Sequence, residues 1–98
     1  MTLHFEIEAL MEYQEAALYS QRRFGLGEEF VLAVESALDA ILMEPDRYQS
    51  VGLGVRIFRL RRFPYYLFYH HSPGSEVITI YAVAHHGRKP GYWRRRVR

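Results

Sequence analysis

Residues 55–84, VRIFRLRRFPYYLFYHHSPGSEVITIYAVA, decide the fold because they contain three runs rich in β-branched and aromatic side chains. The runs cover residues 55–60, 65–71 and 77–84, and each predicts a strand. The turn sequence SPGS at 72–75 separates the last two runs, so we expect those two strands to form an antiparallel hairpin. Sheet hairpins are mostly buried, and the side chains expected in the core are Tyr65, Leu67, Tyr69, Val77, Ile80 and Val83.

The N-terminal residues predict one strand followed by one helix. Apolar and polar residues alternate over residues 2–8, which is the pattern of a strand with one buried face. From Ala9 the composition changes to good helix formers, and apolar residues share one helical face. These are Leu10, Tyr13, Ala17 and Phe24. Gly25 and Gly27 offer the positive φ angles at which helices end, so the first helix should stop at Phe24.

A second helix is predicted by an apolar stripe at helical spacing. Its members are Phe30, Val34, Ala37, Leu38 and Ile41. Glu28 and Glu29 suit the positive end of this helix, and Pro45 disfavours helical geometry at Glu44, so the helix should end near Met43. The order strand-helix-helix-strand-strand-strand predicts an α+β fold, with a helical hairpin packed on one face of a twisted, mainly antiparallel sheet.

Length and composition predict one ordinary globular domain. The 98 residues, 49% hydrophobic and 24% charged, suffice for a single core. There is no cysteine, which removes disulfides, thiol catalysis and cysteine-bound zinc. The acidic N-terminus does not resemble a signal peptide, and no long apolar run could cross a membrane. We therefore expect a cytoplasmic protein with no membrane partner.

Charge is distributed very unevenly along the chain. Residues 1–46 hold ten of the eleven acidic side chains and only two arginines, a net charge of −8. Residues 47–98 hold eleven basic side chains against Glu76 alone, a net charge of +10. Such a basic half attracts a polyanion or an acidic protein segment, whatever the charge of the whole chain.

The sequence contains no pattern that supports metal catalysis or nucleotide binding. In a strand, adjacent residues point to opposite faces, so neither His70–His71 nor His85–His86 should chelate one ion unless the chain bends there. Glu76 alone is too few carboxylates for a two-metal nuclease site. No phosphate-binding glycine motif or serine-hydrolase motif occurs. The sequence predicts no metal and no cofactor.

The remaining chemistry is metal-free cleavage of RNA, which needs proton-transfer groups beside cations that stabilise the phosphate. The available proton-transfer groups are His85, His86 and Tyr92, and the available cations are Arg59, Arg61 and Arg88. The alternative is a basic module that only binds protein or nucleic acid. The arginine-rich ending could equally be a solvated tail or a binding element, and both readings stay open.

The chain resembles the RelE/ParE superfamily of toxins from type II toxin–antitoxin systems. VRIFRLRRFPYYLFYHH at 55–71 and VITIYAVAHHGRKPGYWRRR at 77–96 resemble the C-terminal half of that family. There VRR-x-x-L leads to FPY-x-I-x-Y and then to I-x-I-x-A-V-x-H-x-x-R-x-P-x-Y-W. AALYSQRRFGLGEEF at 16–30 resembles its helical hairpin with the Gly-Leu-Gly turn, and EPDRY at 44–48 resembles the loop that follows. The resemblance covers nearly the whole chain and implies a single toxin domain over residues 1–98.

The resemblance implies a growth-inhibiting toxin that a cognate antitoxin neutralises, often as part of plasmid stabilization. Together with the basic half it predicts an antitoxin with an acidic, amphipathic C-terminal segment. RelE-like members are mRNA interferases that cleave messenger in the ribosome, whereas ParE-like members poison DNA gyrase, and the fold does not choose between them. RelE-like toxins carry an arginine where this chain has Tyr66, and another near His85 and His86. These departures favour the ParE-like side.

Two sets of candidate site residues follow. If the protein is an RNase, the catalytic residues would be His86, Arg88, Tyr92 and Arg59. Arg59 matches a basic position of the family, and Tyr92 matches an aromatic one. The candidates for binding a target or nucleic acid are Arg56, Arg61, Arg62, Arg88, Lys89, Trp93, Arg94, Arg95 and Arg96. We expect a DNA gyrase inhibitor, with a metal-independent, ribosome-dependent endoribonuclease as the alternative and a basic binding module without catalysis as the second alternative.

Overall fold

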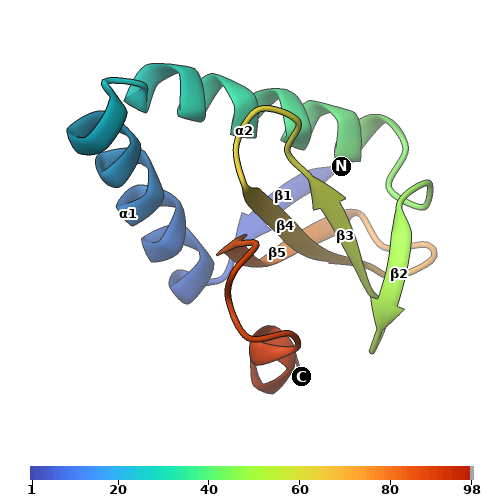
Figure 1. Ribbon diagram of the computed structural model, residues 1–98. Helices are drawn as coiled ribbons and strands as arrows, with labels where there is room; N and C mark the ends of the chain where they lie inside the picture. Colours follow the sequence, from blue (N-terminus) through green and yellow to red (C-terminus); the bar gives the residue numbers. More distant parts are fainter. Residues whose placement is uncertain (98) are drawn as a thin grey trace.

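The computed structural model describes residues 1–97 and confirms the α+β class, with a helical hairpin beside one sheet (Figure 1). The elements are β1 (Thr2–Phe5), α1 (Ile7–Phe24), α2 (Gly27–Met43), β2 (Gln49–Gly52), β3 (Val55–Arg59), β4 (Tyr65–His71), β5 (Val77–His85) and the 3-10 helix η1 (Tyr92–Arg96). Neither α1 nor α2 combines the length and the apolar composition that crossing a bilayer would require.

The five strands form one sheet in the order β1-β5-β4-β3-β2. β1 runs parallel to β5, and the other three pairs are antiparallel. The predicted hairpin is confirmed, because β4 pairs with β5 from Tyr65 opposite His85 to His71 opposite Ile78. The register shifts after Phe68, which marks a bulge in β5.

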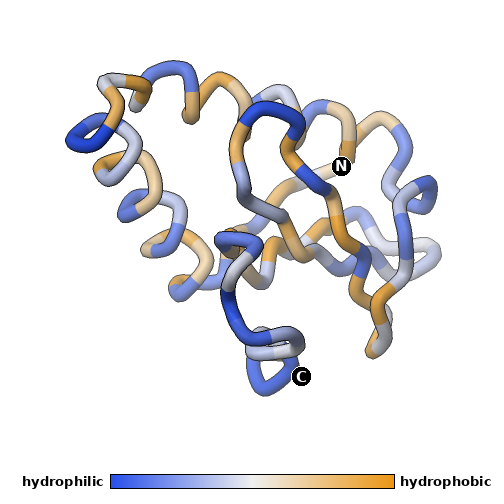
Figure 2. Tube along the Cα trace, viewed as in Figure 1, coloured by the Kyte–Doolittle hydropathy of each residue, from blue (hydrophilic) through white to orange (hydrophobic). Residues whose placement is uncertain are grey.

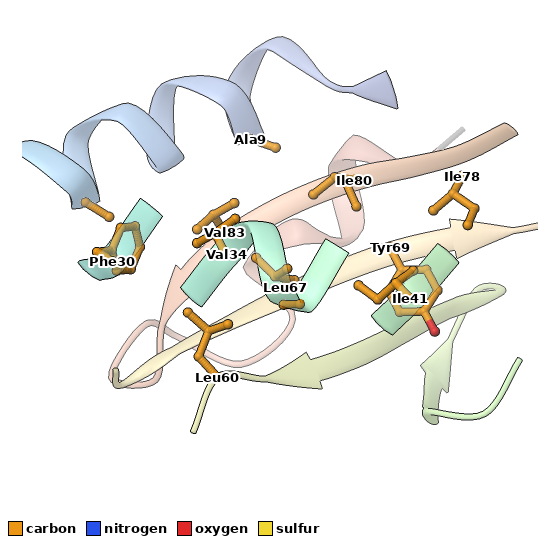
Figure 3. Packing of buried hydrophobic residues seen from close by; sticks show 12 residues of the cluster. Ala9, Phe30, Val34, Ile41, Leu60, Leu67, Tyr69, Ile78, Ile80 and Val83 are labelled. Carbon is orange, nitrogen blue, oxygen red and sulfur yellow. The ribbon is translucent and has the colours of Figure 1, made fainter. Parts of the chain in front are cut away.

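One face of the sheet packs against the two helices. Its core includes Phe30, Val34 and Ile41 of α2, as the apolar stripe predicted, and the β-strand side chains Leu67 and Ile80 (Figure 3). The opposite face carries a second apolar cluster. Its buried members are Val55, Ile57, Phe68, Tyr81, Ala82, Ala84 and Trp93. η1 contributes Trp93 to this second cluster, and Tyr92 of η1 packs against it together with Val51, Tyr66 and Val97.

Several sequence predictions need correction. The first strand ends at Phe5, because α1 already begins at Ile7, whose side chain is exposed. Phe24 and Val77, both expected to be buried, are exposed. β2 was not predicted, since its sequence, QSVG, has a single partly buried residue and no apolar alternation.

The two glycines of the helical hairpin have different roles. Gly25 takes the predicted left-handed conformation, with φ of 68°, and its N–H bonds to the carbonyl of Gln21 to end α1. Gly27 does not have a positive φ and is the first residue of α2. A Cβ there would lie 2.9 Å from the side chain of Gln21, so glycine is needed for the close approach of the helices.

Candidate functional site

The cationic end of the chain folds back onto the sheet. We call residues 88–96 the C-terminal segment; it is mostly hydrophilic and includes η1 (Figure 2). Trp93 within it is only 2% exposed, and its ring stacks on Phe68 of β4 with the centroids 5.3 Å apart and the planes at 24°. The reading of this segment as a loose tail is therefore wrong.

Glu12 of α1 holds the C-terminal segment in place. Its carboxylate accepts a hydrogen bond from the Tyr92 hydroxyl at 2.8 Å. It also pairs with Arg96 through two hydrogen bonds of 2.9 Å, one to each carboxylate oxygen. The backbone N–H of Val83, in β5, donates to Glu12 Oε1 at 3.0 Å. One side chain thus joins α1, β5 and η1, and two-point pairing of this kind is among the stronger polar contacts in proteins.

Arg96 is an internal group. Its side chain is 7% exposed, Nη1 also donates to the carbonyl of Tyr81 at 2.9 Å, and Nε lies 3.6 Å from Glu8 Oε2. Hydrogen bonding to Glu12 raises the pKa of the Arg96 guanidinium, so the side chain stays charged. The prediction that Arg96 contacts a target does not fit this burial.

Tyr92 is also committed to internal contacts. Two guanidinium groups pack on its ring, with Arg88 Cζ 3.9 Å and Arg96 Cζ 4.9 Å from the ring centroid. Burial, followed by the hydrogen bond to Glu12, raises the pKa of the Tyr92 hydroxyl well above its ordinary value of 10.0. Arg88 is drawn to the same carboxylate, with Nη1 3.7 Å from Glu12 Oε2.

A pocket of about 420 Å³ lies between the C-terminal segment and the sheet face that carries the second apolar cluster. It combines an apolar floor with a rim of cations and histidines. Its lining residues are Val51, Ile57, Tyr66, Phe68, Ala84, His85, His86, Arg88, Lys89, Pro90, Gly91, Tyr92, Trp93 and Arg94. None of these residues is acidic, so the rim favours an anionic group.

The structure brings together three of the four residues named for RNA cleavage. His86, Arg88 and Tyr92 line the pocket, whereas Arg59 lies over the ring of Tyr66, with Cζ 5.5 Å from the centroid, and does not line it. The two histidines at the end of β5 do not face opposite ways. β5 ends at His85, the chain turns, and the imidazole centroids of His85 and His86 lie 4.6 Å apart.

The remaining predicted binding residues fall into two groups. Arg56 and Arg94 are tied to backbone carbonyls, of Tyr48 at 2.6 Å and of Val51 at 3.1 Å. The others are exposed and have no ion pair within residues 1–97. They are Arg61, Arg62, Lys89 and Arg95. In the same part of the chain, no group of three or more His, Asp or Glu side chains is placed to hold a metal ion.

Sequence reasoning missed Glu12, the residue with the most polar contacts at this site. It lies in the acidic half of the chain, 80 positions from Tyr92 and 84 from Arg96. In the sequence it is one of several glutamates on a helix, and its spacing gives no sign of these partners. The contact depends on the tertiary fold, in which β1 pairs with β5 and α1, which follows β1, packs against β5.

Comparison with known proteins identifies the family and supports the fold. Residues 3–90 match the family model described as the ParE toxin of the type II toxin–antitoxin system parDE. Among solved structures, a chain from the chromosomal ParDE toxin–antitoxin system of P. aeruginosa superposes with a TM-score of 0.63 at 18% identity, over 87% of this chain and 95% of that one. No curated protein sequence is significantly similar. Because the family model spans most of the sequence, the chain belongs to the ParE toxin family of type II toxin–antitoxin systems.

Proposed function

We propose that this toxin inhibits DNA gyrase through its exposed cationic surface and is neutralised by a cognate antitoxin. The observation that carries the proposal is the hydrogen bond from the Tyr92 hydroxyl to Glu12. Tyr92 is the only tyrosine among the four residues named for RNA cleavage. Its proton is held in the hydrogen bond to Glu12 and its pKa is raised, so it is poorly suited to give that proton to a substrate. Arg88, the cation of that set that lines the pocket, packs on the same ring and faces the same carboxylate.

A toxin that inhibits by binding needs fewer chemical features at its site than one that catalyses a reaction. A binding surface needs exposed groups held in a fixed arrangement, while an RNase needs an acid and a base that are free to exchange protons with the substrate. Four exposed cations of the predicted binding set have neither an ion pair nor a side-chain hydrogen bond within residues 1–97, and they suit a binding surface: Arg61, Arg62, Lys89 and Arg95. Two of them, Lys89 and Arg95, belong to the C-terminal segment, and that segment is held by Trp93 and Arg96.

The proposed antitoxin has an acidic, amphipathic C-terminal segment. The exposed cations would pair with its carboxylates. Its apolar side chains would pack on α1, where Ile7, Met11 and Leu18 are exposed and recur at helical spacing. Coexpression with the adjacent open reading frame tests this, because the two products should purify as one complex. Separate purification, with a toxin that is harmless alone, would contradict the antitoxin proposal.

A metal-independent, ribosome-dependent endoribonuclease is the second candidate. It is favoured by one observation, which is that His86, Arg88 and Tyr92 line the same pocket. In that case His86 would be the proton acceptor, because it is exposed at the rim.

Two assays on purified protein separate the candidates. We expect wild type and His86→Ala to inhibit gyrase supercoiling equally, and both to leave ribosome-bound messenger intact. Cleavage of messenger by wild type that His86→Ala abolishes, with supercoiling unaffected, would identify an RNase and overturn the gyrase proposal.

A further inference from the structure

We propose that Glu12 is a positioning residue, which fixes the C-terminal segment in the arrangement that the toxin uses to bind its target. The inference deepens the proposed function and rests on it, since it assigns to the segment a role in target binding. Glu12 itself is only 15% exposed and its carboxylate oxygens face Tyr92, Arg96 and Val83, so its effect reaches the target through the segment.

The geometry makes Glu12 the main counter-charge of a buried cation. Both terminal nitrogens of Arg96 donate to it at 2.9 Å. The other acid nearby is Glu8, which is largely exposed and 3.6 Å from Nε, an atom without a hydrogen bond. Removing Glu12 would leave a buried guanidinium with its charge poorly balanced, and such a group costs more than the lost contact alone.

Loss of Glu12 would also free the other contacts of the segment. The Val83 N–H and the Tyr92 hydroxyl would lose their acceptor together. The segment would keep the buried Trp93 and two hydrogen bonds to backbone carbonyls, from Arg94 to Val51 and from Arg96 to Tyr81. The segment would then detach more readily, and Lys89 and Arg95 would lose their fixed positions. A binding surface that must be ordered on contact binds more weakly than one ordered beforehand.

The test uses the full chain and Glu12→Gln, which keeps the volume of the side chain and removes its charge. Glu15→Gln is the matched control, because Glu15 is exposed one turn further along α1. Trp93 is the only tryptophan, so its emission reports whether the segment is docked. Trypsin cleavage after Arg94 and Arg95 gives a second report, and growth inhibition in cells measures activity whatever the target is.

We expect Glu12→Gln to shift the Trp93 emission to longer wavelength, to speed cleavage of the segment about tenfold, and to lose growth inhibition by about tenfold. Glu15→Gln should match wild type. The double variant Glu12→Gln/Arg96→Met removes the buried charge with its partner, so it should restore burial of Trp93 and part of the growth inhibition.

Three results would overturn the inference. The first is wild-type emission and cleavage in Glu12→Gln, and the second is a released segment with undiminished growth inhibition. The third is a chain that fails to fold in both the single and the double variant, as circular dichroism would show, since Glu12 would then serve the whole fold. Wild-type protein that leaves gyrase active would refute the proposed target instead, and these readouts, which do not involve gyrase, would still decide the role of Glu12.

Discussion

The Tyr92 hydroxyl donates a 2.8 Å hydrogen bond to Glu12 Oε2 across 80 positions of sequence, and this contact joins the acidic and basic halves of the chain. Some of the basic side chains of the second half of the sequence are thus paired with acidic side chains of the first half. Arg88 and Arg96 face acids of α1, whereas Arg61, Arg62, Lys89 and Arg95 are exposed. Fewer cations are therefore free to contact a target than the number of basic residues in the sequence suggests.

Replacing Tyr92 by Phe should destabilise the protein modestly. The variant keeps the ring packed against Arg88 and Arg96 and removes only the hydrogen bond to Glu12. We expect the free energy of unfolding in urea at neutral pH to fall by about 1.5–3 kcal/mol, the usual range for a hydrogen bond to a charged group. The Trp93 emission of the folded variant should match wild type. An unchanged free energy of unfolding would show that the bond contributes nothing.

Alkaline pH should weaken the fold through its buried phenols. Burial raises the pKa of Tyr69 from 10.0 to about 12, and its hydroxyl donates to the carbonyl of Pro45 at 2.6 Å. Because the folded pKa is the higher one, the stabilisation is complete below pH 10 and is lost as the pH rises towards 12. Each such tyrosine lowers the free energy of unfolding by about 1.4 kcal/mol per pH unit in that window.

The measurement for this pH dependence is urea unfolding of wild type and Tyr69→Phe at intervals from pH 8 to 11.5. The variant is less stable at pH 8 but should lose stability less steeply above pH 10, because one shifted phenol is gone. Parallel curves for the two proteins would contradict the assignment of Tyr69.

Gly54 should tolerate alanine less well than Gly74. Both have positive φ, of 73° and 81°, so backbone strain should lower the free energy of unfolding by about 1 kcal/mol in each variant. A Cβ at Gly54 would also lie 3.0 Å from the His70 ring, whereas nothing lies within 4 Å at Gly74. Thermal unfolding should therefore show a larger loss for Gly54→Ala. Equal losses would mean that the His70 ring moves aside at no cost.

The exposed apolar residues of α1 should matter to the antitoxin and not to the fold. Met11→Glu and Leu18→Glu place a charge on the surface proposed to meet the apolar face of the antitoxin. Each should weaken the complex about tenfold or more in a titration with purified antitoxin. Leu32→Glu, at an exposed position of α2, is the control and should bind like wild type. Equal affinities for all three variants would place the antitoxin elsewhere.

The sequence predicted the elements that local patterns specify and missed those that depend on distant partners. The stripe from Phe30 to Ile41 and the hairpin around residues 72–75 are local, and both are confirmed. β2 has no such pattern, because it is held by pairing with β3 at the edge of the sheet. Trp93 was assigned to a target-binding surface since aromatic and basic residues alternate there, and only the stacking on Phe68 reveals its structural role. The contacts of Glu12 with Val83, Tyr92 and Arg96 leave no recognisable pattern in the sequence.

Gyrase inhibition through the exposed cations is tested most directly by measuring supercoiling in the presence of wild type and of two matched charge reversals. Lys89→Glu/Arg95→Glu reverses two exposed cations of the C-terminal segment, and Arg22→Glu/Arg23→Glu makes the same change in charge at two exposed positions of α1. We expect wild type to inhibit supercoiling, the first pair to require about tenfold more protein for the same inhibition, and the second pair to inhibit like wild type. Supercoiling that wild type leaves untouched, or an equal loss of inhibition in both pairs, would rule out gyrase inhibition through these cations.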